Sequence, residues 1–140
     1  MQTAVPYYPL PQPADILLAR FPTHLAKHLP GPKTRTCLVL FIYDDDHAVE
    51  IAYGTSQKVN KIYRGEFLIS ANDPGFQGTG LRKDTKFDLN NRVIVPFDNA
   101  WFAPPLSGHI ASPPPKIGRV QLEHHNALHK AWKEAGLPVP

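Results

Sequence analysis

Two side chains that could hold a phosphate group stand at the outer ends of a predicted hairpin. The runs TCLVLFIY (36–43) and HAVEIAYGT (47–55) flank a DDD turn, which is a hairpin pattern. Antiparallel neighbours bring the start of one strand beside the end of the other, so Arg35 should lie beside Thr55. A guanidinium fork can grip two phosphoryl oxygens while Thr55 or Ser56 donates to a third. The alternatives are a plain strand-ending turn at Thr55 and Ser56 and a solvated charge at Arg35.

Such a site could support RNA cleavage without a protein nucleophile. The adjacent 2′-hydroxyl can attack the phosphorus, leaving a cyclic phosphate and a 5′-hydroxyl, so the protein must stabilise a more highly charged transition state. Arginine carries protons poorly because its pKa exceeds about 12. His24 and His28 in the adjoining loop are therefore candidates for proton transfer, with exposed bystanders as the alternative. Gly54 would let a nucleic-acid backbone approach closely.

Basic residues gather in three predicted loops of a chain whose formal net charge is +3, which is compatible with a phosphate-bearing partner. The candidate nucleic-acid contacts are these residues and two positions beside Thr55: Lys27, Lys33, Gly54, Gln57, Lys58, Lys61, Arg64, Arg82, Lys83 and Lys86. Ordinary solvated surface is the alternative. Four aromatic side chains could stack on bases or pack in the core and the N-terminal arm: Tyr7, Tyr8, Trp101 and Phe102.

The histidine and cysteine pattern does not indicate a metal site. His125 and His129, which follow His124, are four residues apart as on one helix turn, but the familiar zinc motif needs a glutamate where Asn126 stands. Cys37 is the only cysteine, and its apolar surroundings predict a small core residue. We expect no metal and no cofactor.

The elements that must position these residues are mostly short strands in one domain of 140 residues. Beyond the hairpin, apolar runs predict strands at 14–21, 65–70 and 92–97, which together imply a small barrel. A helix is predicted from Val120 to Ala135, where Gly136 and Pro138 end it. The organisation we expect is a proline-rich arm, a barrel, and a proline-rich connector with the C-terminal helix: 1–13, 14–102 and 103–140.

No stretch approaches the roughly 18 to 20 apolar residues of a membrane span, and the first residues lack the pattern of a signal peptide. We therefore expect no membrane partner and a cytoplasmic location.

The order of these segments resembles the PemK/MazF toxin family over roughly residues 14–135. The matching stretches are KTRTCLVL, EIAYGTSQ, TGLRKDTKF, RVIVPF and IGRVQLEHHNAL. That family's pattern has an arginine entering the second strand and a threonine or serine ending the third, which Arg35 and Thr55 match. The family usually continues with proline after the arginine, where this chain has Thr36.

The resemblance implies a mainly β fold, an SH3-like β-barrel with a C-terminal α-helix. It also implies a metal-independent endoribonuclease of a toxin–antitoxin system that acts on single-stranded RNA, as a homodimer, and is neutralised by an antitoxin protein. Two alternatives stay open. One is a catalytically inactive nucleic-acid-binding module on the same fold, and the other is a protein-binding adaptor or inhibitor that uses the proline-rich segments for docking.

Overall fold

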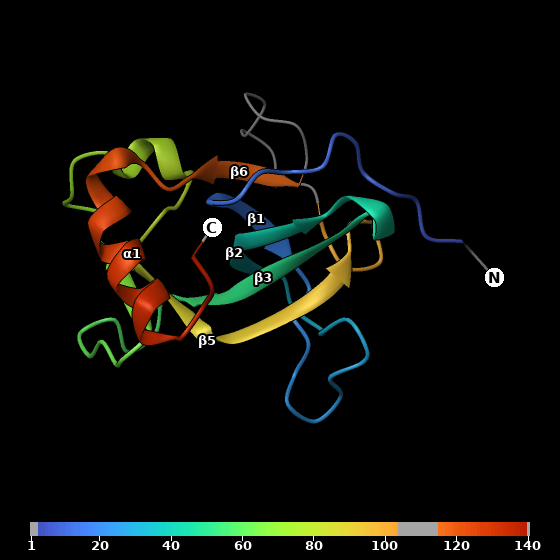
Figure 1. Ribbon diagram of the computed structural model, residues 1–140, viewed down its shortest axis with the longest axis horizontal. Coiled ribbons are helices and arrows are strands. Elements are labelled where there is room, and N and C mark those ends of the chain that lie inside the picture. Colours follow the sequence, from blue (N-terminus) through green and yellow to red (C-terminus); the bar gives the residue numbers. More distant parts are fainter. Residues whose placement is uncertain (1–2, 104–114, 140) are drawn as a thin grey trace.

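The computed structural model describes residues 3–103 and 115–139, and its fold is mainly β. One antiparallel sheet, curled into a half-barrel, has the strand order β4-β5-β3-β2-β1-β6. Its strands are β1 (Asp15–Ala19), β2 (Arg35–Tyr43), β3 (Ala48–Thr55), β4 (Glu66–Ile69), β5 (Thr85–Pro96) and β6 (Lys116–Arg119). Helix α1 (His125–Glu134) stands at one end of the sheet (Figure 1). The predicted fold class, a small SH3-like β-barrel with a C-terminal helix, is confirmed.

The predicted hairpin is formed by β2 and β3. The turn between them is a short 3-10 helix, η1 (Asp44–Asp46), which ends at His47 in the left-handed conformation. Cys37 lies opposite Tyr53, and the register shifts once, between Val39 and Phe41. Such an irregularity bends and twists the strand pair, which helps the sheet to curl.

Both faces of the sheet are buried, because each strand sends alternate side chains to opposite sides. In β3, Ala52 joins an inner cluster, whereas Val49 and Ile51 join an outer cluster. Helix α1 covers the inner cluster with Leu128 and Ala131. The inner cluster also contains Ile16, Leu38, Leu40, Phe67, Ile69, Phe87 and Leu89, and the outer cluster contains Leu17, Cys37, Val39, Val95, Phe97 and Phe102.

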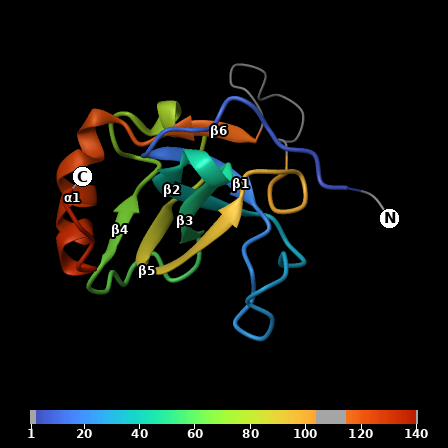
Figure 2. The ribbon, with the colours of Figure 1, turned by 45° about the vertical axis from the view of Figure 1, so that its right-hand side comes forward.

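The N-terminal arm lies along the sheet and packs on the outer cluster. The Tyr7 N–H donates to the Phe97 carbonyl oxygen at 3.1 Å, and Pro6 forms an isolated bridge with Asp98. Figure 2 shows the arm running over β1 and β6 toward the N-terminus. The arm therefore contributes to the fold as an extended, packed segment.

Two predicted element starts are wrong, and one strand was not predicted. Strand β5 begins at Thr85, before the predicted 92–97 segment, because the alternation of Thr85, Phe87 and Leu89 continues the strand through charged positions. Strand β6 was not predicted, since its short sequence becomes a strand by pairing with β1. Helix α1 begins at His125 rather than Val120, after a 3-10 turn, η3 (Leu122–His124). Most of the predicted connector, 104–114, lies outside the described residues.

None of the helices among the residues that the structure describes is long and apolar enough to cross a membrane.

Candidate anion-binding site

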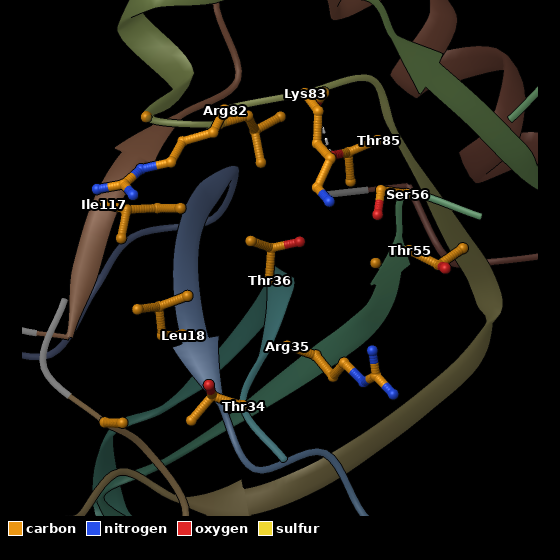
Figure 3. Close-up of a pocket in the computed structure, with 14 residues that line it drawn as sticks. Leu18, Thr34, Arg35, Thr36, Thr55, Ser56, Arg82, Lys83, Thr85 and Ile117 are labelled. Carbon is orange, nitrogen blue, oxygen red and sulfur yellow. Dashed lines mark hydrogen bonds between the residues drawn. The ribbon is translucent and has the colours of Figure 1, made fainter. Parts of the chain in front are cut away.

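A pocket of about 460 Å³ opens where β2 begins and β3 ends (Figure 3). Small-molecule and cofactor sites commonly have volumes of about 300–1,000 Å³, so the pocket could admit a nucleotide-sized group. Among the described residues that line the pocket, three carry a cationic side chain, five carry a hydroxyl group and several are apolar. None of them is acidic. They are Leu18, Thr34, Arg35, Thr36, Gly54, Thr55, Ser56, Gly80, Leu81, Arg82, Lys83, Thr85, Ala103 and Ile117.

Arg35 and Thr55 both line this pocket, as the hairpin geometry predicted. Cys37 lies opposite Tyr53, and continuing this register by two residues places Arg35 opposite Thr55. Directly opposite residues in an antiparallel pair project from the same face of a sheet. In Figure 3 both side chains lie on the other side of their strands from Thr36, so that they stand at the rim of the pocket.

The Thr55 hydroxyl oxygen accepts a hydrogen bond from the Gln57 N–H at 3.1 Å. This bond fixes the turn after β3 and leaves the hydroxyl hydrogen available for donation. The sequence interpretations of Thr55 as a turn former and as a phosphate donor are therefore compatible with each other.

A second group of polar side chains faces the opening of the pocket itself. Thr36 points into the opening, and the Lys83 side chain extends toward Ser56 (Figure 3). The Thr85 hydroxyl donates to the Lys83 carbonyl oxygen at 2.9 Å, which anchors the start of β5. No carboxylate of the described residues forms an ion pair with Arg35 or Lys83. Arg35 and Lys83 thus bring positive charge to a pocket whose described lining contains no carboxylate.

The three basic loops converge only in part. Arg82 and Lys83 join Arg35 in the pocket. The other predicted contacts are exposed but do not line it: Lys27, Lys33, Gln57, Lys58, Lys61 and Arg64. These outlying residues lie on the loops before β2 and after β3, outside the lining of the pocket.

Lys86, a predicted nucleic-acid contact, is instead a buried structural residue. Its side chain is 7% exposed, and its Nζ lies 3.0 Å from Glu66 Oε1. The same ammonium donates to the Lys61 carbonyl oxygen at 2.9 Å. The physical reason is that β5 has neighbours on both sides at this point, with Lys86 opposite Thr55 in β3 and Leu68 in β4.

His24 and His28, the candidates for proton transfer, are exposed on the loop that precedes β2. This loop projects from the body of the sheet in Figures 1 and 2, and neither histidine lines the pocket. The arrangement does not bring them to Arg35 and Thr55.

Gly54 lines the pocket, but its own packing explains why a glycine stands there. A Cβ atom at this position would collide with the Thr36 carbonyl oxygen and would lie 2.8 Å from the Phe87 ring. The absence of a side chain therefore serves the contact between β3 and its neighbours, in addition to leaving room in the pocket.

Cys37 is buried in the outer cluster, so the core interpretation of this residue is confirmed. Burial raises the pKa of its thiol far above the ordinary value, which keeps the thiol protonated at neutral pH. The pair of rings at His125 and His129 has a centroid separation of 6.3 Å. Among the described residues, no group of three or more His, Cys, Asp or Glu side chains could hold a metal ion.

His124 has a structural partner. Its Nε2 lies 2.8 Å from Asp73 Oδ2, and its ring is buried. The hydrogen bond from His124 lowers the pKa of the Asp73 carboxyl. This contact ties the turn after β4 to the start of the C-terminal helix.

The four aromatic candidates divide between packing and exposure. Phe102 is fully buried, and Tyr7 and Trp101 pack against the outer cluster. Tyr8 is exposed and lies against His47, with ring centroids 4.5 Å apart. Sequence reasoning overlooked Tyr63, which is 56% exposed and has the ammonium groups of Lys61 and Lys86 near its ring; its place in the basic segment after β3 was the available signal.

No protein-family model matches the chain, and no curated protein matches it either. The PemK/MazF resemblance stays a prediction.

Proposed function

We propose that the protein is a PemK/MazF-like endoribonuclease that binds single-stranded RNA and cleaves it without a metal, as the toxin of a toxin–antitoxin pair. One observation carries the proposal. The pocket lining has three cationic and five hydroxyl-bearing side chains and no carboxylate among its described residues, and the hairpin register aligns Arg35 with Thr55. A phosphodiester is the ligand that best matches this combination of charge and hydrogen-bond donors.

In the proposed reaction, Arg35 binds two non-bridging phosphoryl oxygens and Thr55 orients the phosphate through its hydroxyl. The 2′-oxygen forms a bond to phosphorus while the bond from phosphorus to the 5′-oxygen breaks. The products are a cyclic phosphate and a 5′-hydroxyl end. Negative charge grows on the non-bridging oxygens, and Arg35 stabilises it in place. Lys83 supplies a second positive charge from the opposite wall.

Two protons must move, one from the 2′-hydroxyl and one to the leaving 5′-oxygen. Because His24 and His28 lie outside the pocket, we assign both transfers to solvent water. Alanine variants of the two histidines test this assignment, and a loss of cleavage in one of them would identify it as the carrier.

A nucleic-acid-binding module without cleavage is the second candidate function. One observation favours it: Thr36, which stands where the family usually has proline, places its side chain in the pocket. In this alternative the cationic pocket still binds a phosphate, but the scissile bond is not aligned for attack.

The test uses purified protein, chelator and a sequence-diverse set of single-stranded RNAs. We expect cleavage with cyclic-phosphate and 5′-hydroxyl ends, and a rate at least about a hundredfold lower for Arg35→Ala, as for loss of one preorganised donor. Thr55→Val should lower the rate less, because the variant keeps the shape and loses only the hydroxyl. Lys130→Ala is the control, since it removes an exposed cation of α1 that does not line the pocket. At saturating RNA this control should cut at the wild-type rate.

Binding is measured on the same proteins across a range of salt. In a plot of the logarithm of the binding constant against the logarithm of the salt concentration, each phosphate neutralised on a single strand contributes a slope of about −0.7. The affinity should therefore fall steeply as the salt concentration rises. Binding without cleavage by wild type would establish the second candidate instead. If wild type does not bind RNA at low salt, both candidates are wrong and the protein-adaptor alternative gains support.

A further inference from the structure

Tyr63 is an exposed aromatic residue with a hydrogen-bonded backbone. It lies in the loop between β3 and β4, and 56% of its surface is exposed. Its backbone N–H donates to Glu66 Oε1 at 2.9 Å, and its carbonyl oxygen accepts from the Glu66 N–H at 3.0 Å. The ammonium groups of Lys61 and Lys86 lie 5.7 and 5.3 Å from the ring centroid, which is cation–π distance. The ring therefore stays exposed while its backbone is hydrogen-bonded and two ammonium groups lie near its face.

The ring is linked through Lys86 to the row of residues that forms the proposed phosphate site. Lys86, whose ammonium contacts the ring, is directly opposite Thr55 in the register of β3 and β5. Directly opposite residues share one face of a sheet, and Arg35 extends the same row beyond Thr55. From Arg35 through Thr55 to Lys86, one face of the sheet thus carries a guanidinium, a hydroxyl and the ammonium that contacts the Tyr63 ring.

We propose that Tyr63 is a stacking platform for a nucleobase of the strand whose phosphate is bound at Arg35 and Thr55, a proposal that rests on the proposed function. An aromatic side chain beside a cationic groove is the arrangement by which proteins bind single strands of varied sequence. Lys61, exposed beside the ring, is placed to meet a neighbouring phosphate.

A nucleic acid suits this surface better than a protein partner does. The only large apolar side chain exposed beside the ring is Ile62, at 43%, among the described residues of this loop. A stable protein interface typically buries about 800 Å² on each partner, far more than two side chains provide. The surrounding charges, Lys58, Lys61 and Arg64, all have the sign that attracts phosphate.

The test compares affinities for a single-stranded RNA in wild type, Tyr63→Ala and Tyr63→Phe. Stacking is lost in the alanine variant, so its affinity should fall by roughly 5- to 150-fold, while phenylalanine should stay within about twofold of wild type. Tyr63→Leu keeps an apolar side chain without a ring and should resemble alanine. Tyr8→Ala is the matched control, because Tyr8 is 72% exposed and contacts His47 at the hairpin turn, at the opposite end of β3 from Thr55.

Two further measurements separate stacking from other effects. An RNA with 2-aminopurine placed beside the bound phosphate should lose fluorescence on binding to wild type and keep it with Tyr63→Leu. With an abasic RNA, wild type and Tyr63→Leu should bind equally. A difference that persists on abasic RNA would overturn stacking, because Tyr63 would then act on the backbone.

The failure of this inference is distinct from that of the proposed function. If wild type binds RNA and both Tyr63→Ala and Tyr63→Leu bind it with wild-type affinity, the Tyr63 platform alone is overturned. Wild type that binds no RNA overturns the proposed function, and the platform with it. Circular dichroism verifies the fold of each variant. If Tyr63→Ala does not fold, the affinity of Tyr63→Leu provides the comparison with wild type.

Discussion

Replacing Lys86 by methionine tests whether this residue is structural or a nucleic-acid contact. Methionine keeps most of the apolar stem of lysine and removes the ammonium. In the wild type that ammonium is bonded to Glu66 and to the Lys61 carbonyl oxygen, and the Lys86 and Glu66 side chains are only 7% and 10% exposed. The substitution therefore leaves a buried carboxylate without its counter-charge.

The expected cost follows from these contacts. Removing one partner of a buried ion pair typically destabilises a protein by about 3–5 kcal/mol. Glu66 keeps one donor, the Tyr63 N–H, so we expect the lower end, about 3 kcal/mol. With an unfolding entropy of about 2.1 cal/mol/K per residue, this loss should lower the melting temperature by roughly 10 °C.

Urea unfolding and thermal melts of Lys86→Met measure the effect, with two comparison proteins. Lys83→Met removes an exposed lysine of the pocket and should change stability by less than about 0.5 kcal/mol, while reducing the salt dependence of RNA binding. The double variant Lys86→Met/Glu66→Gln should recover part of the loss, since glutamine removes the buried charge and keeps an oxygen for the Tyr63 N–H. A cost below about 1 kcal/mol for Lys86→Met, or no recovery in the double variant, would refute this reasoning.

Two more predictions concern packing and pH. Gly54→Ala should destabilise the fold by about 1–3 kcal/mol, because the added methyl group meets the Thr36 carbonyl oxygen and the Phe87 ring; urea unfolding checks this, and equal stability would contradict it. His124 lowers the Asp73 pKa in the folded state, so this ionised carboxyl stabilises the fold above the ordinary value of about 3.9 and ceases to do so as pH falls through the folded pKa. The difference in unfolding free energy between wild type and Asp73→Asn should therefore be constant above about pH 5 and shrink below about pH 4, whereas a difference unchanged at pH 3 would contradict the linkage.

Local sequence patterns predicted the hairpin and the alignment of Arg35 with Thr55. Alternation identifies each strand and the DDD turn joins them, so the start of one strand lies beside the end of the other. Counting back from the Tyr43–Ala48 pair alone would place Arg35 opposite Ser56, and the register shift between Val39 and Phe41 is what aligns it with Thr55. The same local signals located β1 and β4. These features were predictable because each depends on residues close to one another in the chain.

Neighbours distant in sequence decided the rest of the site. Lys83 and Lys86 are three residues apart, yet one faces the pocket and the other is buried against Glu66, since the strands on both sides of β5 determine which lysine is enclosed. Tyr63 is exposed for a similar reason, because its loop is held by the Glu66 and Lys86 contacts rather than by a hydrophobic partner. Strand β6 exists only through its pairing with β1. The type of a basic or aromatic residue indicates which interactions it can make with a ligand. The tertiary contacts around the residue decide whether a ligand can reach it.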